Sequence, residues 1–242
     1  MKSSVKDLIK KLESSSITLR KKASLDLWNL AKSGEDLTNL IPTIAKILKD
    51  KSVEVRIKLV ETLWYISRRK QDISAAVYNL GKALADNYVE VRRNAVWALE
   101  NFAENSHTID AAVPFLVKSL KDEDSMVKKG SAAAIVYHYL NKHEFYGINI
   151  LLNYYLPEVR GNSSEALVYY YLNSGDKKGV KSILTHENHD VTEYAFKGVL
   201  FYIQNSKNKT KLKELKEFLK RIRTKDVSYL VNEINNKLKI LR

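Results

Sequence analysis

The sequence predicts an all-α protein, an α-solenoid (α-α superhelix) of about seven antiparallel helix pairs that repeat every 32–36 residues. Three observations support this fold class. Apolar residues recur at helical spacing, the same residue columns return after a fixed step, and turn formers are scarce, with 8 Gly and 3 Pro among 242 residues. Such scarcity argues against a turn-rich all-β protein and against low-complexity chains.

The repeat is clearest in residues 12–140, where four copies align at steps of 36 residues. One column pairs an aliphatic with a basic residue: Leu19-Arg20, Val55-Arg56, Val91-Arg92 and Val127-Lys128. An apolar column keeps the same step: Leu27, Leu63, Leu99 and Ile135. Later copies follow at steps of 32, 32 and 36 residues, with Val159-Arg160, Val191-Thr192 and Val227-Ser228. This degree of internal similarity indicates stacked supersecondary units.

Each copy is expected to be two antiparallel helices of roughly 12–16 residues joined by a short turn. The first helices are expected near residues 40–50, 75–84 and 111–122, and the second helices follow them. In the third copy one apolar stripe has helical spacing: Val91, Ala95, Ala98, Leu99 and Phe102. No run of residues indicates a strand.

Turn residues mark the helix ends. Residues 50–52 and 122–125 offer side-chain oxygens for N-caps. Gly34 and Gly175, each preceded by serine, are predicted C-caps between copies, and Pro157 suits the first turn of a helix. We expect residues 1–242 to form a single array, with regular repeats in 1–140. Residues 141–242 are expected to hold degenerate repeats and a basic C-terminal cap.

The repeat resembles the HEAT repeat: a turn Asp, then Val-Arg, a small residue three positions later and Leu seven positions later. Residues 40–50 and 111–122 resemble the proline-bearing first helix of that family. The chain is similar to short archaeal and bacterial HEAT-repeat proteins, some of them named by similarity to phycobilin lyases. The resemblance implies that the second helices line a concave face. It also implies that Arg56, Arg92 and Lys128 pair with turn aspartates such as Asp86 and Asp122, but it implies no activity.

The formal net charge is +13, and the surplus lies at the two ends of the chain. Residues 1–70 hold 16 basic and 8 acidic side chains, and residues 206–242 hold 12 and 4, whereas the middle is nearly neutral. Two interpretations fit this distribution. The ends are either soluble caps of the array or basic patches for an acidic partner, nucleic acid included.

Several site classes are disfavoured by composition. The chain has 0 Cys, which excludes disulfides and cysteine-based catalytic or metal sites. No phosphate-binding Gly-rich loop and no Gly-x-Ser-x-Gly elbow occur. A histidine and carboxylate cluster at residues 186–190 lacks a third ligand fixed by sequence, so neither a metal nor a cofactor is expected. No apolar run is long enough for a membrane span and no signal peptide is recognised, so we expect a cytoplasmic protein.

Three tryptophans on second helices form the leading candidate site. Trp28 and Trp64 occupy one repeat column, and Trp97 lies one turn earlier in its copy. Arg93, Trp97 and Glu100 share one helical stripe. If the stripe faces the groove, aromatic and Arg anchors would bind a protein partner there. The predicted partner-binding set is Trp28, Trp64, Arg93, Trp97 and Glu100, and the alternative interpretation is that the tryptophans fill gaps between helices.

A nucleic-acid interface is the alternative function. Extra cations at the starts of second helices are expected to be freer than the Arg column, and residues 211–222 predict a helix with basic and leucine faces. The candidate contacts are Lys21, Lys58, Arg93, Lys129, Lys213, Lys216 and Lys220. We expect the leucine face, Leu212, Leu215 and Leu219, to be buried by the array.

An enzyme of one class also merits comparison. HEAT-like DNA glycosylases for alkylated purines combine a basic concave face with Trp and a carboxylate, and Trp64 or Trp97 with Glu61 or Glu100 could imitate that grouping. However, Asn101 and Arg68, not Asp, lie one turn beyond the two tryptophans. The sequence therefore favours a non-enzymatic scaffold that binds a protein partner. Its tyrosine-rich second half is expected to be core or a subunit interface, in a monomer or weak homodimer.

Overall fold

The computed structural model describes residues 5–222 and 227–241, with side chains from residue 7 onward. The chain divides into two compact units, Met1–Phe145 and Tyr146–Arg242. Their boundary lies within residues 141–160, where the sequence period breaks. A single domain over residues 1–242 stays a prediction.

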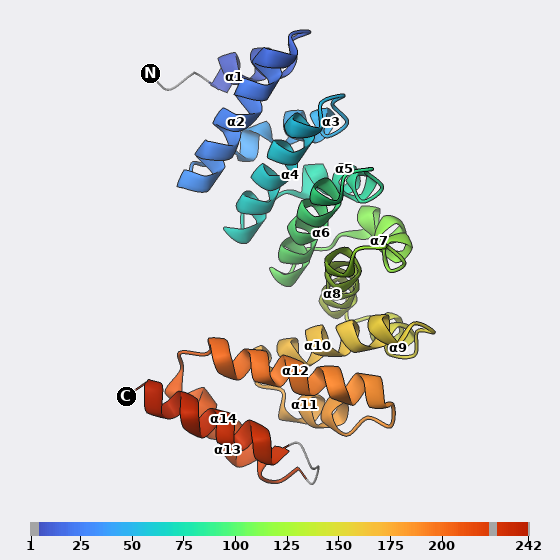
Figure 1. Cartoon of the computed structure of the whole chain (residues 1–242), viewed down its shortest axis with the longest axis vertical. Coiled ribbons are helices and arrows are strands. Elements are labelled where there is room, and N and C mark those ends of the chain that lie inside the picture. Colours follow the sequence, from blue (N-terminus) through green and yellow to red (C-terminus); the bar gives the residue numbers. More distant parts are fainter. Residues whose placement is uncertain (1–4, 223–226, 242) are drawn as a thin grey trace. The chain divides into compact units, whose positions relative to one another are not determined.

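Unit 1 holds four helix pairs within its described residues (Figure 1). The first helices are α1 Val5–Leu12, α3 Ile41–Ile47, α5 Val77–Ala83 and α7 Val113–Ser119. The second helices are α2 Ile17–Ser33, α4 Val53–Arg68, α6 Val89–Glu104 and α8 Ser125–Asn141. In Figure 1, α3, α5 and α7 lie in one row, and α2, α4 and α6 lie side by side in another.

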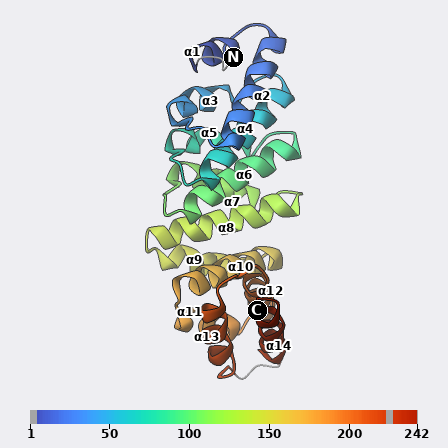
Figure 2. The same cartoon turned by 90° about the vertical axis from the view of Figure 1, so that its left-hand side faces the viewer.

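Unit 2 also consists of helices in pairs (Figure 2). Its helices are α9 Phe145–Leu152 at the boundary, α10 Pro157–Ser174, α11 Lys177–Leu184, α12 His189–Asn205, α13 Lys209–Leu219 and α14 Val227–Ile240. Every regular element in the described ranges is helical, and the helices form seven pairs. The prediction of an all-α solenoid is therefore confirmed.

The first helices of the regular repeats are shorter than the 12–16 residues expected. A 3₁₀ turn precedes α3, α5 and α7, at Thr38–Leu40, Ser74–Ala76 and Asp110–Ala112. The residue before each turn, Leu37, Ile73 or Ile109, is buried. Because this apolar side chain must enter the core just before the helix begins, the chain turns tightly there and only seven residues remain α-helical.

The core forms where successive second helices pack on one another. In unit 1, α2, α4, α6 and α8 make consecutive contacts, and in unit 2 α10, α12 and α14 do the same. The predicted apolar column is buried throughout: Leu27, Leu63, Leu99 and Ile135. Ala23, Ala95 and Ser131 occupy a fully buried column of mostly small side chains, which lets neighbouring helices approach closely.

The predicted caps are largely confirmed. Gly34 and Gly175 end α2 and α10 with φ of 92° and 78°, in the left-handed region that favours glycine. Pro157 begins α10, and the Asp124 carboxylate accepts hydrogen bonds from the N–H groups of residues 126 and 127. Ser52 differs, because its hydroxyl donates to Glu54 and makes no capping bond to the backbone.

A ladder of arginine–aspartate pairs connects successive repeats. Nε of Arg56 lies 2.6 Å from Oδ2 of Asp86, and the Arg92 and Asp122 pair is 2.9 Å apart. The other rungs join Arg20 to Asp50 in unit 1 and Arg160 to Asp190 in unit 2. Hydrogen bonds to Asp86 and Asp122 raise the pKa of Arg56 and Arg92. The pairing implied by the family resemblance is confirmed for Arg56 and Arg92, and that of Lys128 stays a prediction.

Breaking one rung tests its contribution to stability. The Arg92 and Asp122 side chains are 8% and 10% exposed, so Arg92→Gln leaves a nearly buried carboxylate without its cation. We expect the free energy of unfolding to fall by about 2–4 kcal/mol. The control is Lys21→Gln. The side chains of Lys21 and its partner Glu54 are 42% and 59% exposed, so losing this pair should lower the free energy of unfolding by less than about 1 kcal/mol. Urea unfolding followed by circular dichroism measures both, and equal costs would contradict the assignment.

A second buried polar contact holds the start of the fourth pair. His138 on α8 is buried, and its Nδ1 accepts a hydrogen bond of 3.2 Å from the N–H of Ile109. Nε2 lies 3.6 Å from Oδ1 of Asp110. Burial lowers the pKa of His138, and the Asp110 carboxylate raises it. The effect of burial is the larger one, so the pKa is lowered overall. The imidazole is therefore neutral at pH 7, as its acceptor role requires.

This contact predicts acid sensitivity. Below pH 6.5 the unfolded chain binds a proton at His138 more readily than the folded chain, because the folded pKa is lowered. Stability should therefore fall as the pH drops below about 6.5. In His138→Asn, whose side-chain oxygen accepts without titrating, this part of the pH dependence should disappear. Urea midpoints at pH 7 and pH 5 compare the two proteins, and identical shifts would refute the role of His138.

Candidate partner-binding site

The three tryptophans lie on consecutive second helices of unit 1. Trp28 is on α2, Trp64 on α4 and Trp97 on α6. These helices pack side by side, so a residue column in the sequence becomes a row across the helices. The common face of α2, α4 and α6 that carries these rings is called the aromatic row below.

Ring contacts make the aromatic row continuous. The centroids of Trp64 and Trp97 are 5.8 Å apart and their planes are tilted by 42°. Trp28 meets Tyr65 edge to face at 6.3 Å, and Tyr65 lies 5.0 Å from Trp64. Such separations suit the offset and edge-on arrangements that aromatic pairs prefer. Tyr65 joins α2 to α4, a role that the sequence columns did not indicate.

Cations cover two of the indole rings. Nζ of Lys58 and of Lys32 lie 4.2 and 4.8 Å from the Trp28 ring, and the guanidinium of Arg68 lies 5.0 Å from the Trp64 ring. These distances are within the range of a cation–π interaction. Lys32 and Arg68 each follow their tryptophan by four residues, one helical turn. This spacing of an aromatic and a basic residue was visible in the sequence and could have indicated the two cation–π contacts.

The burial of the three indole rings shows whether they face solvent or belong to the core. Trp28, Trp64 and Trp97 are all half-buried, whereas the leucine column beneath them is fully buried. The tryptophans therefore fill space between helices and also present surface. Nε1 of Trp28 is buried and has no hydrogen-bond partner, which is unusual for an indole.

Arg93 is bound within the array. Its guanidinium donates to both carboxylate oxygens of Asp124, at 3.1 and 2.5 Å, and this lowers the pKa of Asp124. Because Asp124 also caps α8, Arg93 connects α6 to the start of the next second helix. The Glu100 side chain extends toward Gly130 on α8. A Cβ atom added to that glycine would lie 3.2 Å from Oε2 of Glu100. The structure thus places both residues beside the aromatic row, with Arg93 already paired.

The expectation that the extra cations are freer was wrong for three of them. Lys21 pairs with Glu54 at 2.9 Å, Lys58 with Glu61 at 2.7 Å, and Arg93 with Asp124. Acidic residues at the start of a neighbouring second helix, or one turn away on the same helix, supply the partners. Lys129 is exposed at the start of α8.

The basic C-terminal helix α13 buries its leucines as expected. Leu212, Leu215 and Leu219 are buried, and Lys213 on the opposite side is exposed. Lys216 is half-buried, and Lys220 pairs with Glu217 at 2.7 Å. The prediction that these lysines bind nucleic acid is not tested by this arrangement.

Residues 5–222 and 227–241 contain no group of three or more His, Cys, Asp or Glu side chains placed to hold a metal ion. No helix in the described part of the chain is long and apolar enough to cross a membrane.

Comparison with known proteins identifies the repeat. Residues 89–136, which span α6, α7 and most of α8, match the family model of the HEAT-like repeat. None of the curated proteins matches the chain. An engineered protein solved by the Northeast Structural Genomics Consortium is similar over 97% of this chain and 67% of its own, with 22% identity and a TM-score of 0.54.

Designed armadillo repeat proteins are similar as well. One is 22% identical over 79% of this chain and 96% of its own, with a TM-score of 0.51. A second, solved in complex with the peptide (KR)4, is 23% identical over 81% and 98% of the two chains, with a TM-score of 0.53. At this identity the likeness concerns the fold alone.

The half-buried state of Trp64 predicts a moderate effect on stability. Trp64→Ala removes the contacts with Tyr65 and Trp97 and the cation above the ring. We expect a loss of about 1–2 kcal/mol, below the roughly 3–5 kcal/mol typical of a fully buried Trp. Urea unfolding with unchanged far-ultraviolet circular dichroism at zero denaturant is the measurement. A loss above that range, or lost helicity, would show that Trp64 is core.

Proposed function

Because residues 89–136 match the HEAT-like repeat and the chain folds as an all-α solenoid, we propose that it is a non-enzymatic scaffold that binds a protein partner through the aromatic row. The family resemblance leads us to expect this second-helix face to be the concave one. The single observation that carries the proposal is the continuous row of half-exposed indole and phenol rings across α2, α4 and α6.

The physical properties of this row favour protein recognition. Tryptophan and tyrosine offer large contact areas with few rotatable bonds, so little conformational entropy is lost on binding. Neighbouring rings already hold one another in place, which reduces the cost of ordering them. Lys32 and Arg68 surround the rings with donors that could orient an extended peptide.

The partner chemistry follows from the groups that remain available. Trp28 and Trp64 present apolar surface, and the exposed Lys32 and Arg68 are cationic. A peptide segment with an apolar or aromatic side chain flanked by carboxylates fits this combination. One designed armadillo protein of similar fold was solved in complex with a peptide, which supports peptide binding as a use of the architecture.

Nucleic-acid binding has weaker support. Phosphates would have to compete with Glu54, Glu61 and Asp124 for three of the cations that the sequence nominated. The glycosylase-like alternative is also weak, since the Glu61 carboxylate is already bound by Lys58.

A selection experiment tests the proposed function. A displayed peptide library is panned against the full chain, and enriched peptides are measured by fluorescence anisotropy. We expect Trp28→Ala with Trp97→Ala to weaken binding at least tenfold, because interface anchors of this type contribute about 2 kcal/mol or more each. Circular dichroism must show an intact array.

The matched control removes an exposed aromatic ring elsewhere. Tyr229 on α14 is 55% exposed, and Tyr229→Ala should leave the affinity unchanged. Enriched peptides that bind the tryptophan variant as well as the native chain would overturn the proposal. Labelled duplex and single-stranded oligonucleotides at low and physiological salt form a further arm, and tight, salt-dependent binding there would favour the nucleic-acid alternative.

A further inference from the structure

A row of lysines runs along the first helices of unit 1, the helices that do not carry the aromatic row. Lys46 on α3, Lys82 on α5 and Lys118 on α7 are separated by 36 residues each, and Lys10 on α1 keeps the same step. All four side chains are exposed. Because α3, α5 and α7 contact one another in order, the column forms a row in space, called the lysine row below.

No negative charge accompanies Lys46, Lys82 and Lys118 on their own helices, whereas α1 carries Asp7 one turn before Lys10. The segments that form α3, α5 and α7 contain no Asp or Glu, and the lysine is the one formally charged residue in each. Among the described residues, Lys46 and Lys118 have no ion-pair partner. Nζ of Lys82 rests 4.5 Å from the Tyr78 ring. These cations thus differ from Lys21, Lys58 and Arg93, whose charges are already paired.

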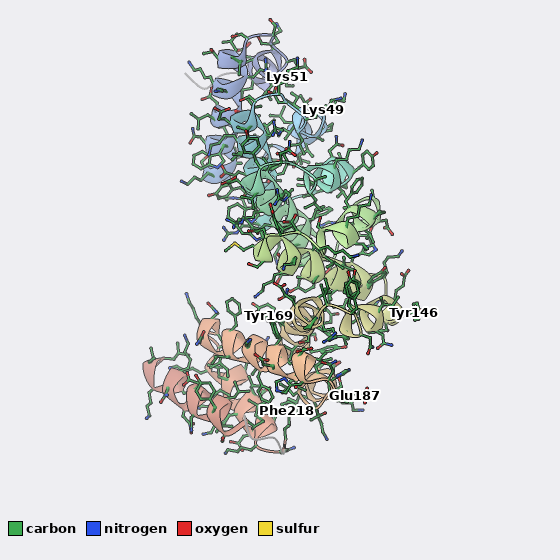
Figure 3. All side chains as sticks on the ribbon, turned by 45° about the vertical axis from the view of Figure 1, so that its right-hand side comes forward. Lys49, Lys51, Tyr146, Tyr169, Glu187 and Phe218 are labelled. Atoms are coloured by element: carbon green, nitrogen blue, oxygen red, sulfur yellow. The ribbon has the colours of Figure 1, made fainter. Side chains whose placement is uncertain are left out.

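The lysine row borders a cavity of about 480 Å³ between α3 and α5. Lys46, Lys49 and Lys82 line it together with Asn79 and Asn87. Lys49 lies on the turn after α3, where Figure 3 labels it. Asp50 and Asp86 also line the cavity, but their charges are matched by Arg20 and Arg56. Three cations therefore remain uncompensated around one open space.

Helix polarity accounts for part of this pattern. A lysine in the last turn of a helix stabilises its carbonyl end by a few tenths of a kcal/mol, wherever around the helix it lies. That effect does not explain why each lysine keeps the same exposed register, why acidic residues are absent from three helices, or why Lys49 adds a third cation at the cavity. These features together indicate a surface that attracts an anion.

We propose that the lysine row binds an acidic polypeptide segment, with one of its carboxylates seated in the cavity between Lys46, Lys49 and Lys82. Packed helices lie about 8–10 Å apart, so the row presents one cation at about that interval. A carboxylate recurs every 10 Å or so when acidic residues stand three apart in an extended chain or seven apart in a helix. The spacing of the row thus matches a polypeptide.

A nucleic acid fits the row less well. Each strand of duplex DNA carries a phosphate every 3.4 Å or so, about three charges for each lysine. Residues 71–140, which supply the middle of the row, hold 7 basic and 9 acidic side chains, so the surrounding field does not favour a dense polyanion.

The test uses the full chain and a labelled peptide with glutamate at every third position and uncharged residues between, in fluorescence anisotropy at low salt. Lys46→Gln with Lys82→Gln should weaken binding roughly five- to tenfold, and Lys46→Arg with Lys82→Arg should retain it. The charge-matched control is Lys213→Gln with Lys216→Gln on α13, which should change the affinity by less than about twofold. Trp28→Ala with Trp97→Ala should leave it unchanged, which separates this proposal from the function of the aromatic row.

Three results would overturn the proposal. The first is no binding of the peptide at low salt. The second is an equal loss in the row variant and the α13 control, which would mean general charge attraction. The third is tighter binding of an oligonucleotide of the same formal charge that depends on Lys46 and Lys82, which would assign the row to nucleic acid.

Discussion

The ion pair between the arginine of one second helix and the aspartate of the next turn fixes the register of the array. Apolar packing between helices is strong but has no preferred direction. The Arg56 guanidinium, in contrast, donates to Asp86 and also to the carbonyl oxygen of residue 50 at 2.8 Å. Asp86 in turn accepts from the N–H of Tyr88, so one carboxylate holds both the rung and the start of α6. Each repeat is thereby aligned with its neighbour by directional contacts.

This alignment converts sequence columns into surface rows. Trp64 contacts Trp97, and Tyr65 connects Trp28 to Trp64, because each second helix is displaced from its neighbour in the same way. The same offset places Lys46, Lys82 and Lys118 on consecutive first helices. Two surfaces of different chemistry therefore arise from one repeat geometry, and a change at a rung of the ladder would disturb both.

The sequence predicted what depends on a single helix or on the 36-residue step. The buried leucine column and the glycine caps are of this kind, whereas the rungs at Arg56 and Arg92 were implied by the resemblance to the HEAT repeat. It did not predict pairs whose residue types do not recur from copy to copy, such as Arg93 with Asp124 or Lys21 with Glu54. The short first helices were also missed, because the 3₁₀ turns depend on burying Ile73 and its equivalents against the core. Helical periodicity does not record that constraint.

Local pairing, more than net charge, determines what each face can attract. The chain carries a formal charge of +13, but at the second helices Lys58, Arg92 and Arg93 are neutralised by neighbouring carboxylates. An interaction on that face relies mainly on ring surface, which salt screens little, with Lys32 and Arg68 as the cations beside the rings. The first-helix lysines keep their charge, so an interaction there weakens as ionic strength rises, with a Debye length near 10 Å at 0.1 M salt. A scaffold built in this way could hold two partners through forces that respond differently to the same solution conditions.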